Sequence, residues 1–155
     1  MANHTRPTPS IDAFQYAVVD LASAVDLRHL VMGLRRSVAV TLFARDAPRA
    51  VVEVGPFLVR LSEAPDVERS ISSFQKDLPW GYFVHSTFDL LSLRHSLRRF
   101  NLVRLSDPPK EVLFRYWDPR VIRTYLEIAT KEQRARLFEI IDRIETADGF
   151  VARNN

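Results

Sequence analysis

Runs of apolar residues predict the strands of this chain. Phe14–Asp20 alternates and then becomes apolar, which is typical of a strand that ends at an aspartate. Val38–Phe43 is a β-branched apolar run whose length fits a strand buried on both faces. Shorter strands are predicted at 82–85, 101–105 and 111–117, and the apolar runs 51–54 and 57–61 flank Gly55-Pro56, where the proline forces a bend or bulge.

Apolar positions spaced three and four residues apart predict five helices, which start near Ser23, Pro65, Ser86, Asp118 and Thr130. Two of these starts are strongly marked. In Asp118-Pro119 an aspartate can cap the helix and the proline sits at the first helical position, while Thr130 and Gln133 have the spacing of a capping box. The third and fifth helices carry the clearest apolar stripes, formed by Leu90, Leu93 and Leu97 and by Leu137, Ile140, Ile141 and Ile144.

Strands that alternate with helices predict an α/β domain with a mixed sheet of five to six strands and about five flanking helices. The strands on either side of Asp107-Pro108-Pro109 are expected to pair antiparallel across a turn. No repeat or linker divides the chain, so we predict one domain over 13–146, a flexible N-terminal tail at 1–12 and a C-terminal tail at 147–155.

Composition narrows the class of protein. The chain has 155 residues, of which 46% are hydrophobic, enough for one buried core. No apolar run approaches the roughly 20 residues of a membrane-spanning helix, and Met1–Ser10 lacks the apolar segment of a signal peptide. The chain has no cysteine, which excludes disulfides, thiol catalysis and iron–sulfur clusters. We therefore expect a cytoplasmic protein without a membrane span.

The basic residues of this chain are nearly all arginines, and their small excess over the acidic residues does not indicate a nucleic-acid partner. The net charge is only +3, and three of the 22 basic residues are lysines, so 19 are arginines. Arginine forms bidentate pairs with carboxylates and phosphates and is enriched at protein interfaces. A net charge of +3 does not by itself require a nucleic-acid partner. Four arginines on or after the third helix, namely Arg94, Arg98, Arg99 and Arg104, nevertheless leave an RNA- or DNA-binding module open as a minor hypothesis.

No standard catalytic signature is present. The chain has no glycine-rich phosphate loop, no G-x-S-x-G turn and no H-E-x-x-H helix. An alternative hypothesis remains, in which a small α/β ligand-binding domain or enzyme uses Asp20, His85, His95 and Arg115. That hypothesis predicts a deep polar pocket that joins these four side chains.

The corner between the strand 111–117 and the following helix carries the most distinctive local pattern. Arg115 and Arg120 bracket the capping residue Asp118, which predicts an ion-pair network that fixes the corner or presents Arg120 to a partner. Trp117 lies directly before the cap, and Trp80 follows the helix-ending Pro79. Large aromatic residues at such boundaries either cover the core or anchor a partner.

At this corner the sequence resembles a known family. The run FRYWDPRVI at 114–122 is similar to a signature of the type VI secretion adaptor or effector-chaperone proteins, the Tap/VasW-like family that carries domain of unknown function 4123. Other blocks follow in the family's order: YAVVD at 16–20, GPFLV at 55–59, PWG at 79–81 and, more loosely, HSLR at 95–98. The resemblance runs from about Phe14 to Ile128.

The resemblance implies a non-enzymatic adaptor that needs no cofactor or metal. Members of the family bind a toxic effector in the cytoplasm and help to load it onto the VgrG spike protein. The expected partners are therefore an effector and VgrG, and not nucleic acid or a membrane. As candidate protein-binding residues we name Arg94, Arg98, Arg99, Trp80 and Arg120, and as structural residues of the motif blocks Arg115, Trp117, Asp118, Pro119, Gly55 and Pro56.

Overall fold

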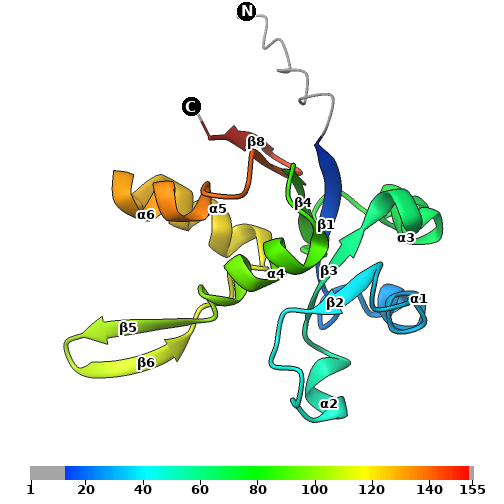
Figure 1. The fold of residues 1–155 in the computed structure, drawn as a ribbon, viewed down its shortest axis with the longest axis horizontal. Helices are drawn as coiled ribbons and strands as arrows, with labels where there is room; N and C mark the ends of the chain where they lie inside the picture. Colours follow the sequence, from blue (N-terminus) through cyan, green and yellow to red (C-terminus); the bar gives the residue numbers. More distant parts are fainter. Residues whose placement is uncertain (1–12, 154–155) are drawn as a thin grey trace, which may run out of the picture.

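A six-stranded antiparallel sheet forms the centre of the molecule (Figure 1). The computed structural model describes residues 13–153, and the N-terminal tail expected at 1–12 lies outside them. Strand order across the sheet is β2-β3-β1-β4-β7-β8. The strands are β1 (Phe14–Asp20), β2 (Ala39–Thr41), β3 (Pro56–Arg60), β4 (Gly81–Ser86), β7 (Arg143–Thr146) and β8 (Gly149–Ala152).

Helices cover both faces of the sheet (Figure 1). One face is covered by η1 (Val25–Leu27), α1 (Arg28–Met32) and α3 (Pro65–Ser72), and the other by α4 (Leu90–Arg98), α5 (Pro119–Ile128) and α6 (Lys131–Leu137). The short helices α2 (Arg49–Val52) and η2 (Leu61–Glu63) flank β3 in the sequence. Within residues 13–153 none of the helices has the length and apolar character needed to span a bilayer.

The alternation of side chains along β1 creates two separate apolar cores. Tyr16 and Val18 point to the side of α4 and α5, whereas Ala17 and Val19 point to the side of α1 and α3, and all four are fully buried. Successive residues of a strand face opposite sides, so a central strand with helices on both faces must be apolar throughout. This requirement explains why β1 ends as a continuous apolar run.

The α/β class and the single domain with a six-stranded sheet are confirmed, but the expected mixed sheet is antiparallel at every pairing. The helix α3 connects β3 to β4, and these two strands do run in the same direction. They are not neighbours, because β1 lies between them and pairs antiparallel with each. The result is a split β-α-β unit, which a linear alternation of strands and helices does not reveal.

The helix starts predicted at Asp118 and Thr130 are confirmed by their capping hydrogen bonds. The Asp118 carboxylate accepts a hydrogen bond from the Arg120 backbone N–H at 2.9 Å, and Pro119 occupies the first turn. Thr130 and Gln133 form the reciprocal capping box. The third helix begins later than Ser86, since Asp89 is its cap and accepts from the Ser92 backbone N–H at 2.8 Å.

The C-terminal segment differs most from the prediction. The last helix ends at Leu137, and Ile144 belongs to β7, whose hairpin partner β8 lies within the predicted C-terminal tail at 147–155. The apolar positions at Ile140, Ile141 and Ile144 are compatible with the spacing of a helix and also with that of a strand. Residues 143–146 form a strand because they pair with β4. The apolar run 51–54 also differs, because residues through Val52 form α2.

The strand predicted at 111–117 ends at Leu113. It is β6 (Pro109–Leu113), which pairs with β5 (Leu102–Ser106) in a separate two-stranded hairpin, so the expected antiparallel pair is confirmed. The hairpin extends away from the body of the domain (Figure 1). Residues after Leu113 form the corner that leads to α5.

Candidate protein-docking site

The motif blocks of the sequence meet at the end of β1. The buried Asp20 donates its backbone N–H to the Trp80 carbonyl at 2.7 Å, and the next residue, Leu21, donates to the Gly55 carbonyl at 3.2 Å. The Asp20 carboxylate accepts from the Arg115 guanidinium at 3.4 Å. Four blocks that are far apart in the sequence therefore share one junction, in which the side chains of Asp20 and Arg115 have a structural role.

Glycine is required twice at this junction. Gly81 has a φ of +140°, and a Cβ there would collide with the Val18 carbonyl oxygen. At Gly55 a Cβ would lie 2.5 Å from the Phe43 ring. Both positions therefore exclude a side chain, which accounts for the glycines in the GPFLV and PWG blocks.

The predicted corner network is present in part, because Arg120 pairs with Asp118 as expected but Arg115 pairs with Asp20 instead. Arg120 binds Asp118 through Nε at 3.0 Å and Nη2 at 2.7 Å, while Arg115 pairs with Asp20 and lies outside a strand with half of its side chain exposed. The hydrogen bonds from the Arg120 side chain, and then its backbone N–H, hold the pKa of Asp118 below its usual value against the opposing effect of burial. Trp117 is buried against Phe43 and so covers the core.

The base of the β5–β6 hairpin is anchored to the body by Asn101. Its amide nitrogen donates to the Leu42 carbonyl at 2.9 Å, its amide oxygen accepts from the Tyr116 hydroxyl at 3.1 Å, and its backbone carbonyl accepts from the Phe114 N–H at 2.8 Å. These three bonds fix the direction in which the hairpin leaves the domain. We refer to residues 102–113 as the arm.

The arm exposes apolar side chains that have no cover within the described chain. Leu102 and Leu113 face each other across the two strands and are 55% and 52% exposed, and Leu105 is 46% exposed. Among the described elements, β5 and β6 make extensive contact only with each other. An isolated two-stranded hairpin is marginally stable in water, and exposed leucines on it mark a surface that another molecule can cover.

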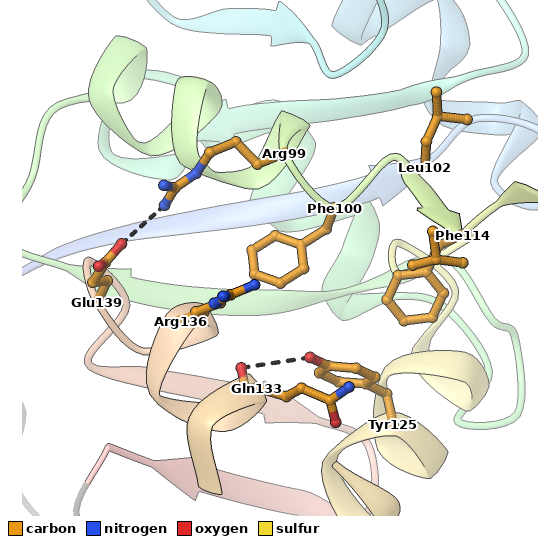
Figure 2. A pocket seen from close by; sticks show the side chains of 9 residues that line it. Arg99, Phe100, Leu102, Phe114, Tyr125, Gln133, Arg136 and Glu139 are labelled. Carbon is orange, nitrogen blue, oxygen red and sulfur yellow. Dashed lines mark hydrogen bonds and ion pairs between the residues drawn. The ribbon is translucent and has the colours of Figure 1, made fainter. Parts of the chain in front are cut away.

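A pocket of about 500 Å³ lies at the base of the arm (Figure 2). Its floor is aromatic, since Phe100, Phe114 and Tyr125 line it, and the last two rings lie 5.2 Å apart. Arg99 and Glu139 bridge its rim at 2.9 Å. Leu102 lines both the pocket and the arm, so the pocket continues onto the face of the arm that carries Leu102 and Leu113, whereas Leu105 lies on the opposite face. An apolar surface with a polar rim is typical of protein interfaces.

Most of the candidate protein-binding residues do not form a free surface. Arg94 is buried and donates to the Thr41 and Phe43 carbonyls, and Arg98 is half-buried. Trp80 is partly buried with its ring 5.1 Å from that of Phe83. Arg120 is exposed but paired with Asp118, and only Arg99 lines the pocket. Of the five residues, Arg99 and Arg120 are therefore the exposed ones, because a charge pattern in the sequence does not report burial.

The polar pocket of the alternative hypothesis does not form. Asp20 and Arg115 meet, but His85 pairs with Gln15 at the other end of β1, about 17 Å along the strand. His85 lies 3.5 Å from Glu145, and burial, together with Arg143, lowers its pKa. His95 is exposed on α4. Within residues 13–153, no three histidine or carboxylate side chains come close enough to hold a metal ion.

The arginines of the nucleic-acid hypothesis are also divided. Arg94 is bonded to carbonyls, Arg99 to Glu139, and Arg104 lies opposite Glu111 in the arm. These arginines therefore do not form one exposed basic patch. The sequence signal for the arm is the antiparallel pair predicted around Asp107-Pro108-Pro109, because pairing across that turn places Leu102 opposite Leu113. Only the structure shows that no further strand joins this hairpin.

One family comparison matches this arrangement of blocks. The family described as domain of unknown function (DUF4123) covers residues 15–136, from β1 through most of α6. The chain belongs to the DUF4123 family. The matched part of the DUF4123 domain includes the junction at Asp20 and the whole arm, whereas β7 and β8 lie beyond it. Neither the curated proteins nor the solved structures contain a match to the chain.

Proposed function

We propose that this DUF4123 domain is a non-enzymatic cytoplasmic adaptor that binds a type VI secretion effector and helps to load it onto the VgrG spike. The single observation that carries the proposal is the arm, whose exposed Leu102 and Leu113 lie on a face that continues into an aromatic pocket. Family membership and the ordered motif blocks support the secretion role, because the resemblance to the Tap/VasW-like adaptors rests on the same blocks.

The arm and the pocket suggest how an adaptor would hold a partner. Covering the half-exposed side chains of Leu102, Leu105 and Leu113 contributes roughly 1 kcal/mol each before the costs of association. The aromatic floor of the pocket offers rigid contact area for an apolar anchor of the partner. An adaptor that also contacts the spike raises the effective concentration of effector near it, which promotes loading without chemistry.

Co-expression tests the proposal directly. The tagged full chain is co-expressed with the VgrG protein and the effector-like protein encoded by neighbouring genes, and complexes are captured on the tag. We expect at least one of the two proteins to be retained in stoichiometric amount. Retention of neither would contradict the adaptor role.

The part played by the arm is tested by substitution. Leu102→Ser with Leu113→Ser removes two apolar side chains that are more than half exposed, so the melting temperature should change little while partner capture falls about tenfold. The matched control is Val25→Ser with Ile128→Ser, which removes apolar side chains that are 55% and 76% exposed elsewhere. Equal capture by the two double variants would remove the arm from the proposal.

A further inference from the structure

A second groove, of about 610 Å³, lies along the outer edge of the sheet at β2. It shares no lining residue with the pocket at the base of the arm. Its apolar lining comes from elements on both sides of the strand. It includes Val31, Met32, Leu34, Val40, Val52 and Leu91, together with Ala39 and Phe57.

The charged lining of this groove is entirely positive. Arg36 precedes β2, Arg45 follows it, and Arg94 reaches it from α4, while the lining contains no aspartate or glutamate. Arg36 and Arg45 are exposed, and neither forms an ion pair with the residues that the structure describes. Burial lowers the pKa of Arg94, and the charges of Arg98 and Arg45 lower it further. The groove thus carries positive charge without a counter-charge of its own.

The backbone at this edge has free hydrogen-bonding groups. Arg60 N–H donates to the Val38 carbonyl and Leu42 N–H to the Pro56 carbonyl, so the even-numbered residues of β2 face β3. Ala39 and Thr41 therefore direct their polar groups outward. The Ala39 N–H is bonded to the Arg35 carbonyl and the Thr41 carbonyl to Arg94, which leaves the Ala39 carbonyl and the Thr41 N–H without a partner among residues 13–153. One residue of a strand added parallel to β2 can bond to both.

We propose that this groove binds an extended segment of a partner protein, in which apolar and acidic residues alternate, as an added strand at β2. Every second side chain of such a strand faces the side of the sheet on which Val31, Met32, Leu34 and Val52 lie. The acidic residues that alternate with them reach Arg36 and Arg45 at the two ends of β2. The added strand would also cover an edge that would otherwise stay open to unspecific pairing.

The charge and the lining of the groove favour this occupant over a second copy of the chain and over a nucleic-acid strand. A second copy joined through its own β2 would bring two sets of these arginines together, which is unfavourable. A nucleic-acid strand needs exposed aromatic rings for its bases, but the single aromatic residue in the lining, Phe57, is only 6% exposed. The inference does not depend on the adaptor role proposed above, because it uses a different surface and requires only a protein partner.

Selection from a random dodecapeptide library displayed on phage tests the inference, with the full chain as bait. We expect enriched peptides in which apolar and acidic residues alternate. The most enriched peptide, labelled and measured by fluorescence polarisation, should bind at least about tenfold more weakly to Arg36→Glu/Arg45→Glu than to the unchanged chain. The control Lys76→Glu/Lys131→Glu has the same change in net charge on exposed residues outside the groove and should bind as the unchanged chain does.

A second measurement locates the added strand. Amide hydrogen exchange at Thr41 should slow when the peptide binds, because its N–H becomes an inter-strand donor, whereas exchange at Val40, which already bonds to β3, should change little. The melting temperatures of both double variants, measured without peptide, check that they are folded.

Four outcomes would overturn the inference. They are the absence of enriched peptides, enrichment without acidic residues, equal binding by the two double variants, and unchanged exchange at Thr41. Arginine-dependent binding of a single-stranded DNA oligonucleotide in place of peptides would assign the groove to nucleic acid. Self-association that Arg36→Glu/Arg45→Glu abolishes would assign it to a second copy. Loss of effector and spike capture with intact peptide binding would contradict the adaptor role alone.

Discussion

Replacement of Asp118 by alanine removes two interactions at one corner. The carboxylate caps α5 through the Arg120 backbone N–H and holds the Arg120 guanidinium in a bidentate pair. Asp118 is 4% exposed, so the truncated site cannot be fully rehydrated by water. We therefore expect a loss of stability without a change of fold.

The two losses have different sizes. An N-cap aspartate replaced by alanine costs about 1 kcal/mol. The ion pair adds about 0–1 kcal/mol, because the Arg120 side chain is 71% exposed and solvent screens its charge. The sum, about 1–2 kcal/mol, lowers the melting temperature of a domain of this size by roughly 2–8 °C.

Urea unfolding followed by tryptophan fluorescence measures this loss, because Trp117 is buried next to the substituted residue. Two controls separate the interactions: Asp118→Asn keeps a neutral cap, and Arg120→Ala keeps the cap but removes the ion pair. Each should lose less stability than Asp118→Ala. The pKa of Asp118 is lowered in the folded state, so its contribution is complete above pH about 4 and disappears as the pH falls through the lowered value.

The reasoning is refuted if Asp118→Ala unfolds at the same urea concentration as the unchanged chain at pH 7. An Arg120→Ala loss equal to that of Asp118→Ala would show that the ion pair, and not the cap, stabilises the corner. A stability difference between the unchanged chain and Asp118→Ala that stays constant down to pH 2 would contradict the assigned protonation.

Two further predictions concern β4 and the β7–β8 turn. Gly81→Ala should destabilise the fold by about 2 kcal/mol more than Gly149→Ala in thermal unfolding. Both glycines have a positive φ, but only at Gly81 would a Cβ collide with backbone, at Val18. Equal losses would show that this collision is not the cause. Burial and the charge of Arg143 lower the pKa of His85, so the unchanged chain should lose stability as the pH falls from about 6.5. The His85→Gln variant should lose less stability between pH about 7 and about 5.5, as measured by the urea midpoint. Equal midpoint shifts in the two proteins would contradict this prediction.

The sequence located the structural residues of the site better than its surface. The blocks around Asp20, Gly55, Trp80 and Arg115 are identified in the sequence, and the structure shows that they build one junction. The protein-binding residues were placed on the arginines of α4, of which Arg94 is buried. The leucines of the arm resemble core residues in the sequence, and only the absence of a covering element makes them a candidate docking surface.

The sequence alone determined part of the local structure: the extended segments that form β1, β3 and β4, the capping residues that begin α5 and α6, and the single α/β domain. These features depend on propensity, periodicity and hydrogen bonds between residues a few positions apart. The tertiary structure decided which strands are neighbours, that Ile144 lies in a strand, and which edge and arm stay uncovered. Those features depend on competition between distant segments for the same apolar surface and backbone partners, and no single stretch of the chain encodes the outcome.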